Sequence, residues 1–226
     1  MIILLPACSY PSKYQCSSSS LRELSLISNI NYLHDQGFSL HNILVVDNGF
    51  QKPAVPTGVR LIYDNSLFST VPQIGEALMT MKAVNSISKD ILVLKLHSRC
   101  KLRNISKLTH FINCKDEFVF VRRNMLRFSR SNFNKCPFAE TRLYLLKSNN
   151  LKSIMNIVTS VISDSIYLEH AFLAAAYQVP DVRPKLLTHG NFYPVFDGPS
   201  GHGVNYSSIT SFFKSYVHHF LYRLGI

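Results

Sequence analysis

Short apolar runs alternate with stretches of helical periodicity in the N-terminal half of the chain. The runs are rich in Ile, Leu and Val, as is typical of buried strands, and cover residues 2–5, 43–46, 59–63 and 91–96. Apolar residues recur at helical spacing over 21–35 and 72–88. Strands that alternate with helices in this way predict an α/β fold, with a mainly parallel, Rossmann-like sheet flanked by helices.

The C-terminal half is less regular. Its predicted strands and helices cover residues 118–121, 142–146, 148–161 and 164–178. Asp164 precedes the apolar run of the last helix and is expected to be its N-cap. The glycine-rich stretch from Asp197 to Gly203 predicts a loop.

Residues 208–226 form a separate amphipathic segment. Apolar side chains, Phe212 and Leu221 among them, would share one broad face of a helix that also carries basic residues. Such a helix suits the interface of an anionic membrane, and it equally suits a terminal helix docked on the core. We expect a single α/β domain over 1–207 and an amphipathic C-terminal helix over 208–226.

The composition limits the classes of protein to be considered. Of 226 residues, 46% are hydrophobic, which is enough for a sizeable core, yet no apolar run approaches the roughly 20 residues of a spanning helix. The five Cys are odd in number and include no Cys-x-x-Cys pair, which favours reduced thiols in the cytosol. The net charge of +11 points to nucleic acid, anionic lipid or a phosphorylated substrate as partner.

The candidate chemistry gathers where two predicted strands end. Lys95, His97, Arg99 and Lys101 lie at the carboxyl end of the strand at 91–96, where open α/β sheets bind ligands. This cluster indicates an anionic ligand, although a solvated run of charges has the same pattern. The strand at 43–46 ends in Asp47-Asn48-Gly49, which suits either contacts with a nucleoside or a tight turn.

In this order of elements the chain resembles small bacterial glycosyltransferases of the GT-A type that build lipopolysaccharide or capsule. The likeness rests on Val45-Val46-Asp47-Asn48, on a Lys-x-x-x-Arg stretch from Lys95 to Arg99, on Tyr167-Leu168-Glu169-His170 and on the loop 198–203. It implies a GT-A-like fold that receives a nucleotide-sugar donor near the first of these motifs. The last two motifs resemble the acceptor side of such enzymes.

The chain departs from this family in one respect that concerns the metal. GT-A enzymes usually hold a divalent cation with Asp-x-Asp, and this sequence contains none. Adjacent carboxylates such as Asp116-Glu117 would point in different directions on a strand. Cationic side chains can instead stabilise the leaving phosphate, and the candidates are Lys95, Arg99, Lys101 and Arg103. We therefore expect no divalent metal and no permanently bound cofactor.

The remaining candidate residues each have a second interpretation. Gly75 would let the donor approach closely, and Glu76 beside it reads equally as an acid in the first turn of a helix. Glu169 is the preferred acceptor base, with His170 as its alternative, although Glu169 also suits a solvent-facing position. The glycine-rich loop would either close over a sugar or phosphate or form a flexible surface loop. Its candidate donor contacts are Ser200, Gly201 and His202.

Together these features predict a glycosyltransferase that moves a sugar from a nucleotide-sugar donor to a surface glycan or lipid-linked acceptor. In that interpretation Asp47, Asn48 and Gly75 bind the donor, while Lys95 and Arg99 also stabilise the leaving phosphate. The expected location is the cytoplasm, peripheral on the inner face of an anionic membrane. The alternatives are a non-catalytic, basic nucleic-acid-binding protein and an inactive transferase-like scaffold. We do not expect nucleic acid as partner, because the sequence has no compact binding signature.

Overall fold

The computed structural model describes residues 1–11, 16–88, 90–122, 138–186, 195–199 and 205–206. The predicted C-terminal helix at 208–226 and its boundary with the preceding domain therefore lie outside the described residues. The same holds for three predicted donor contacts: Ser200, Gly201 and His202.

The core of the molecule is a seven-stranded sheet with the order β3-β2-β1-β4-β7-β6-β8. Its strands are β1 (Ile2–Ala7), β2 (Ile43–Asp47), β3 (Arg60–Tyr63), β4 (Leu92–Leu96), β6 (Phe118–Arg122), β7 (Phe138–Lys147) and β8 (Pro184–Leu186). Only β7 runs against its neighbours in this sheet, and the other pairs are parallel. The prediction of a mainly parallel α/β sheet is confirmed.

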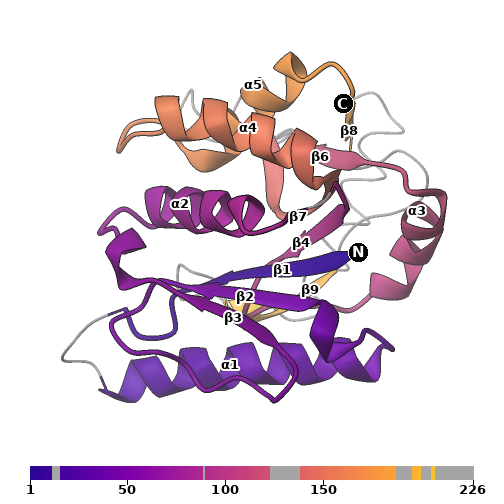
Figure 1. Cartoon of the computed structure of the whole chain (residues 1–226). Coiled ribbons are helices and arrows are strands. Elements are labelled where there is room, and N and C mark those ends of the chain that lie inside the picture. Colours follow the sequence, from indigo (N-terminus) through magenta and orange to yellow (C-terminus); the bar gives the residue numbers. More distant parts are fainter. Residues whose placement is uncertain (12–15, 89, 123–137, 187–194, 200–204, 207–226) are drawn as a thin grey trace.

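Helices cover both faces of this sheet (Figure 1). Helix α1 (Cys16–Asp35) lies on one face, and α2 (Pro72–Asn85), α4 (Ser148–Val161) and α5 (Leu168–Gln178) lie on the other. The short α3 (Thr109–Cys114) follows a 3-10 turn at Ile105–Leu108. Two further 3-10 turns, Leu40–Asn42 and Asn65–Leu67, precede β2 and α2.

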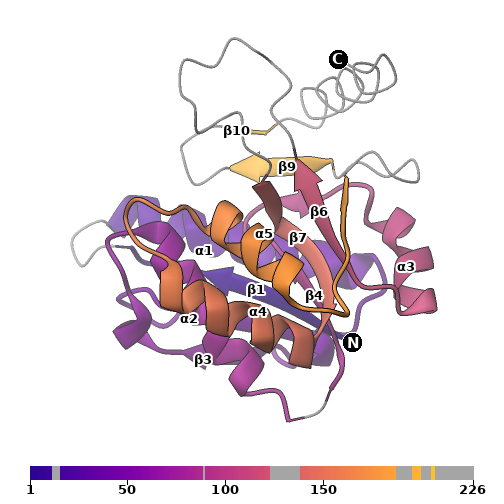
Figure 2. The same cartoon turned by 90° about the horizontal axis from the view of Figure 1, so that it is seen from above.

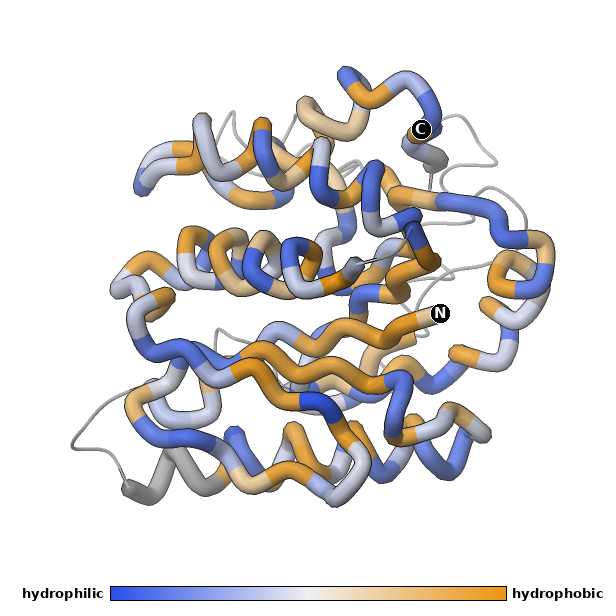
Figure 3. Tube along the Cα trace, viewed as in Figure 1, coloured by the Kyte–Doolittle hydropathy of each residue, from blue (hydrophilic) through white to orange (hydrophobic). Residues whose placement is uncertain are grey.

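The alternation of side chains along the strands divides the core into two layers. Ile3 and Leu5 pack on the side of α1, whereas Leu4 packs on the side of α2 and α4. Because both faces are covered, the central strands are mostly apolar, as Figure 3 shows by the colour of β1 and β2. This burial explains why the strands could be identified from continuous runs of Ile, Leu and Val.

A second, smaller sheet has the order β10-β9-β5 (Figure 2). It joins β5 (Lys101–Leu102), β9 (Phe196–Pro199) and β10 (Asn205–Tyr206). The prediction of a loop from Asp197 onward is wrong for residues 197–199, because Asp197 pairs with β5 while Gly198 and Pro199 pair with β10. Gly198 has φ +131°, and a Cβ there would lie 2.7 Å from the carbonyl oxygen of Arg99. Gly198 thus permits close contact with the backbone of Arg99, although a glycine in this stretch suggested a turn.

The second half also departs from prediction at one helix start. Helix α5 begins at Leu168 with Tyr167 as its N-cap, four residues later than predicted. Ser163 and Ile166 form a β-bridge instead, so Asp164 lies in a turn and caps no helix. None of the helices in the described part of the chain is long and apolar enough to cross a membrane.

Candidate functional site

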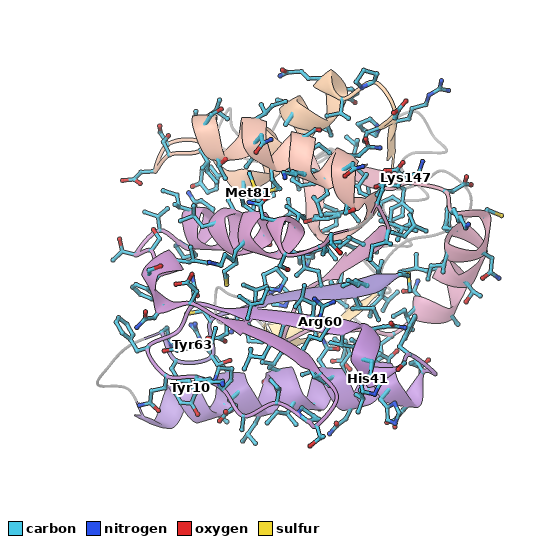
Figure 4. All side chains as sticks on the ribbon, viewed as in Figure 1. Tyr10, His41, Arg60, Tyr63, Met81 and Lys147 are labelled. Carbon is cyan, nitrogen blue, oxygen red and sulfur yellow. The ribbon has the colours of Figure 1, made fainter. Side chains whose placement is uncertain are left out.

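A cavity of about 430 Å³ opens at the carboxyl ends of β1, β2 and β4. Strand β1 has β2 on one side and β4 on the other, and the helices that follow β1 and precede β4 lie on opposite faces of the sheet. This is the switch point at which open α/β sheets form a crevice. Figure 4 shows Tyr10 and Tyr63 at this edge of the sheet and Lys147 at the opposite edge.

The cavity is lined by loops after the strands and by two helices. The polar, charged and aromatic residues in its walls include Cys8, Arg22, Asn48, Phe68, Glu76, His97 and Arg99. Of the predicted donor-binding residues, the structure therefore brings Asn48, Gly75, Lys95 and Arg99 together.

Asp47 lies behind the wall of this cavity and orders the loops around it. Its side chain is fully buried, with Oδ2 accepting the Ser9 N–H at 2.9 Å and Oδ1 accepting the Gly49 N–H at 2.8 Å. Burial raises the pKa of the Asp47 carboxyl. This arrangement corresponds to the turn-forming interpretation of Asp47, and its neighbour Asn48 is the residue that lines the cavity.

Gly75 lets helix α2 approach the end of β2. A Cβ at this position would lie 3.0 Å from Asn48 Nδ2, which donates a hydrogen bond to the Leu67 carbonyl at 3.0 Å. The glycine therefore makes room for Asn48 as well as lining the cavity.

Lys95 lies inside β4, one residue before the strand ends, with 2% of its surface exposed. Alternation along the strand turns it toward α2, where Nζ donates to Glu76 Oε1 at 2.5 Å and to the Thr141 carbonyl. Glu76 follows the first turn of α2, which contains no acidic residue, so the first-turn interpretation of Glu76 is wrong. Lys95 is thus a buried cation with a carboxylate partner at the cavity wall.

We expect Lys95→Ala to lower the free energy of unfolding by about 2–4 kcal/mol, because it leaves a void and removes the partner of Glu76. The measurement is urea denaturation of the purified variant. Lys82→Ala is the matched control, since Lys82 is exposed and pairs with Asp64 at 3.1 Å, and it should change stability far less. Equal stability of the Lys95 variant and the wild type would contradict the buried pair.

Two guanidinium groups line the cavity, from Arg22 on α1 and Arg99 in the loop after β4. Arg22 Nη1 is 3.5 Å from the Cys8 carbonyl oxygen. Burial and the positive charge of Arg22 both lower the pKa of Arg99. In the part of the chain that the structure describes, neither guanidinium forms an ion pair. An anion in the cavity would relieve the repulsion between them.

Arg22 was not identified from the sequence, where it stands within a helical pattern. The signal that could have found it is topological, since the helix that follows a parallel strand begins at the carboxyl edge of the sheet. A cation near the start of such a helix lies beside the ligand crevice.

His97 lines the same cavity with an uncharged ring. Its Nδ1 accepts the backbone N–H of Arg99 at 3.2 Å. Burial and the neighbouring Lys95, Arg99 and Arg142 hold the pKa of His97 well below its usual range. Because Nδ1 is an acceptor, the ring proton is on Nε2. Asn29 Nδ2 donates to the carbonyl oxygens of His97 and Ser98, at 2.9 and 3.2 Å, and so fixes this loop on α1.

Glu169 lies in the first turn of α5 and is not among the residues that line the cavity. Burial raises the pKa of its carboxyl, and the charges of Glu76 and Glu140 raise it further. Glu140 itself is buried and accepts two hydrogen bonds of 2.6 Å from the Arg142 guanidinium. The alternative base, His170, is half-buried, with its ring centroid 5.9 Å from that of Phe138.

Lys101 and Arg103 do not line this cavity, although the sequence placed them beside the donor phosphate. The turn after β4 leads into β5, and Lys101 in this strand and Arg103 directly after it line a neighbouring groove on the side of α1. There Arg103 forms an ion pair with Asp197.

A set of side chains suited to a divalent cation is absent from the described ranges. No group of three His, Cys, Asp or Glu residues within them could hold a metal. Glu117 accepts hydrogen bonds from Asn150 and from the Lys147 backbone, near the start of α4, so the Asp116-Glu117 pair lies away from the cavity.

Comparison with known proteins identifies the fold and not the family. No family model matches the chain, and no curated protein matches it either. Among solved structures, an active-site mutant of LgtC, a GT-A glycosyltransferase, superimposes with a TM-score of 0.52 over 83% of this chain and 74% of that chain. The identity is 12%, so the likeness shows the fold alone, an α/β, Rossmann-like arrangement similar to that of a GT-A protein.

Proposed function

We propose that this chain is a glycosyltransferase that uses a nucleotide-sugar donor. The observation that carries the proposal is the pair Arg22 and Arg99 in the cavity at the strand ends. Two guanidiniums without a carboxylate partner in the described residues suit a diphosphate, which bears the matching negative charge. The GT-A-like fold supports the same assignment, because LgtC is itself a glycosyltransferase.

The donor would bind with its diphosphate between Arg22 and Arg99. The Nε2–H of His97 would donate a further hydrogen bond to the diphosphate. The ring is uncharged at neutral pH because its pKa is lowered. Asn48 and Phe68 line the same cavity and offer an amide and an aromatic face to the nucleoside. Phe68 is supported by Phe50, whose ring centroid is 4.7 Å away.

In the reaction, an acceptor hydroxyl attacks the anomeric carbon of the donor sugar. The new C–O bond forms as the bond to the diphosphate oxygen breaks, and the nucleoside diphosphate leaves with the electron pair. Arg22 and Arg99 stabilise the charge that develops on this leaving group without a metal ion. Glu169 takes the proton of the acceptor hydroxyl, for which its raised pKa is suited if the reaction inverts configuration.

The acceptor would be a surface glycan or a lipid-linked glycan at the inner face of the cytoplasmic membrane. The net charge of +11 favours an anionic membrane surface and phosphorylated acceptors. LgtC, with the similar fold, is a lipooligosaccharide galactosyltransferase, which supports this class of acceptor.

A thermal-shift screen of UDP-, GDP-, CMP- and dTDP-sugars tests the proposal, with manganese and with EDTA. We expect one donor class to raise the melting temperature, since a ligand that binds only the folded state stabilises it. The increase in melting temperature and the turnover should both persist in EDTA, because the Arg22 and Arg99 side chains take the place of the metal ion. Full loss in EDTA with recovery on manganese would contradict the metal-independent mechanism.

A salt titration with RNA and DNA provides the control for the rival function. A basic nucleic-acid-binding protein would bind them with strong salt dependence. Such binding, without stabilisation by any nucleotide sugar, would overturn the proposed function.

A further inference from the structure

A second hollow runs along α1 and meets the donor cavity at Arg99. It consists of two adjoining cavities of about 330 and 350 Å³, which share Leu24, Ser28 and Lys101 in their walls. Arg99 lines the first of them as well as the donor cavity. We call this hollow the α1 groove. Its helical wall extends from Leu21 to Asp35, about 20 Å at the rise of an α-helix.

The end of the α1 groove beside the donor cavity is cationic. Arg99, Lys101 and Arg103 line it together with a single carboxylate, that of Asp197. Arg103 pairs with Asp197, whereas no ion pair of Arg99 or Lys101 occurs among the described residues. This end therefore retains an excess of positive charge that suits a phosphate group.

Tyr32 fixes two of these cations in the wall. Lys101 Nζ and the Arg103 guanidinium each lie 5.8 Å from the centroid of its ring. The Tyr32 hydroxyl donates to the Leu102 carbonyl at 2.8 Å, which ties the ring to β5. The cations are thus held beside the groove by the fold itself.

The opposite wall at this end is apolar and open to solvent. Leu21 and Leu24 are 65% and 59% exposed, and they lie one turn apart on α1. The core-facing side of the same helix has its own apolar set, Leu26, Ile30 and Leu33, all fully buried. The exposed pair is therefore surplus to the core and available to an apolar ligand.

We propose that the α1 groove binds an acceptor whose glycan is joined through phosphate to a long apolar chain. This inference rests on the proposed function, because it deepens the identity of the acceptor. The phosphate would contact Lys101 and Arg103, and the chain would contact Leu21 and Leu24. The attached sugar could then enter the donor cavity past Arg99. A groove that is cationic on one wall and apolar on the other matches such an amphiphile more closely than it matches a free glycan.

Calorimetry with farnesyl diphosphate, below its micelle concentration, tests this assignment. We expect Lys101→Ala to weaken binding about tenfold or more, through the loss of a charge-assisted hydrogen bond. Leu24→Ser should weaken it severalfold, through the loss of apolar contact. The matched controls are Lys107→Ala, exposed on the 3-10 turn before α3, and Val161→Ser, 44% exposed on α4. Both should bind as the wild type, and melting temperatures verify that all four variants fold.

Further arms identify where and how the probe binds. Inorganic diphosphate should bind at least tenfold more weakly than farnesyl diphosphate, and Leu24→Ser should not affect it. If both probes bind equally and Leu24→Ser has no effect, the ligand is an anionic glycan and the lipid assignment is overturned. If Arg22→Ala abolishes binding of farnesyl diphosphate while Lys101→Ala does not, the probe occupies the donor cavity and the α1 groove is overturned. Nucleotide-sugar binding by Lys101→Ala, measured separately, reports on the proposed function alone.

Discussion

Replacing both Arg22 and Arg99 with Ala is expected to weaken binding of the nucleotide-sugar donor at least about a hundredfold. Each guanidinium would supply a charge-assisted hydrogen bond to the diphosphate, worth about 1.5–3 kcal/mol. Arg99→Ala alone should lower turnover about ten- to a hundredfold or more, by the same energies. Calorimetry with the donor found in the thermal-shift screen measures the affinity, and steady-state kinetics measure the turnover.

Two comparisons make this result specific. Arg99→Lys should recover little, because an ammonium cannot reproduce the two-pronged contact of a guanidinium. Arg60→Ala is the matched control, since Arg60 is exposed on the edge strand β3 (Figure 4). Wild-type affinity in the double variant would remove the diphosphate from this cavity, and with it the principal support for the proposed donor.

The same substitutions should weaken donor binding without lowering the stability of the fold. Arg22 and Arg99 both line the cavity and repel each other, and this repulsion is one cause of the lowered pKa of Arg99. Removing one of the two charges should therefore leave the melting temperature unchanged or raise it slightly. Groups held for binding rather than for folding are expected to behave in this way.

The sheet could be predicted from the sequence because its central strands are buried on both faces. Runs such as 43–46 and 91–96 are continuous in apolar residues, and only a covered parallel sheet combines such runs with intervening helices. The carboxyl edge of that sheet then identified the region of the site in advance. Asn48, Lys95 and Arg99 are singled out in this way, Gly75 by its place near the start of a helix, and all four line the cavity.

The roles of individual residues were harder to predict, because they depend on long-range partners. Lys95 pairs with Glu76, 19 positions earlier, and no local pattern reveals that contact. Similarly, β9 exists because it pairs with β5, nearly a hundred residues before it, so its turn-like composition was misleading. Sequence patterns report local preference, and these contacts are decided by tertiary pairing.

Glu169→Gln is expected to lower turnover about a hundred- to ten-thousandfold while leaving donor affinity unchanged, as the loss of a general base does. Glu169 lies outside the residues that line the donor cavity, which is why affinity should not change. Asp181→Asn, at an exposed position after α5, is the control for removal of a negative charge. Unchanged turnover in the Gln variant would exclude Glu169 as the base.

The pH profile gives a second and sharper measure of Glu169. A base must be deprotonated to act, so turnover should fall as the pH drops through the pKa of Glu169. Because burial, Glu76 and Glu140 raise that pKa, the fall should begin at a higher pH than an ordinary glutamate would give. Glu76→Gln removes one of the two neighbouring charges and should move the acid limb of turnover to lower pH. An acid limb that stays in place in Glu76→Gln would show that the titrating group is not Glu169.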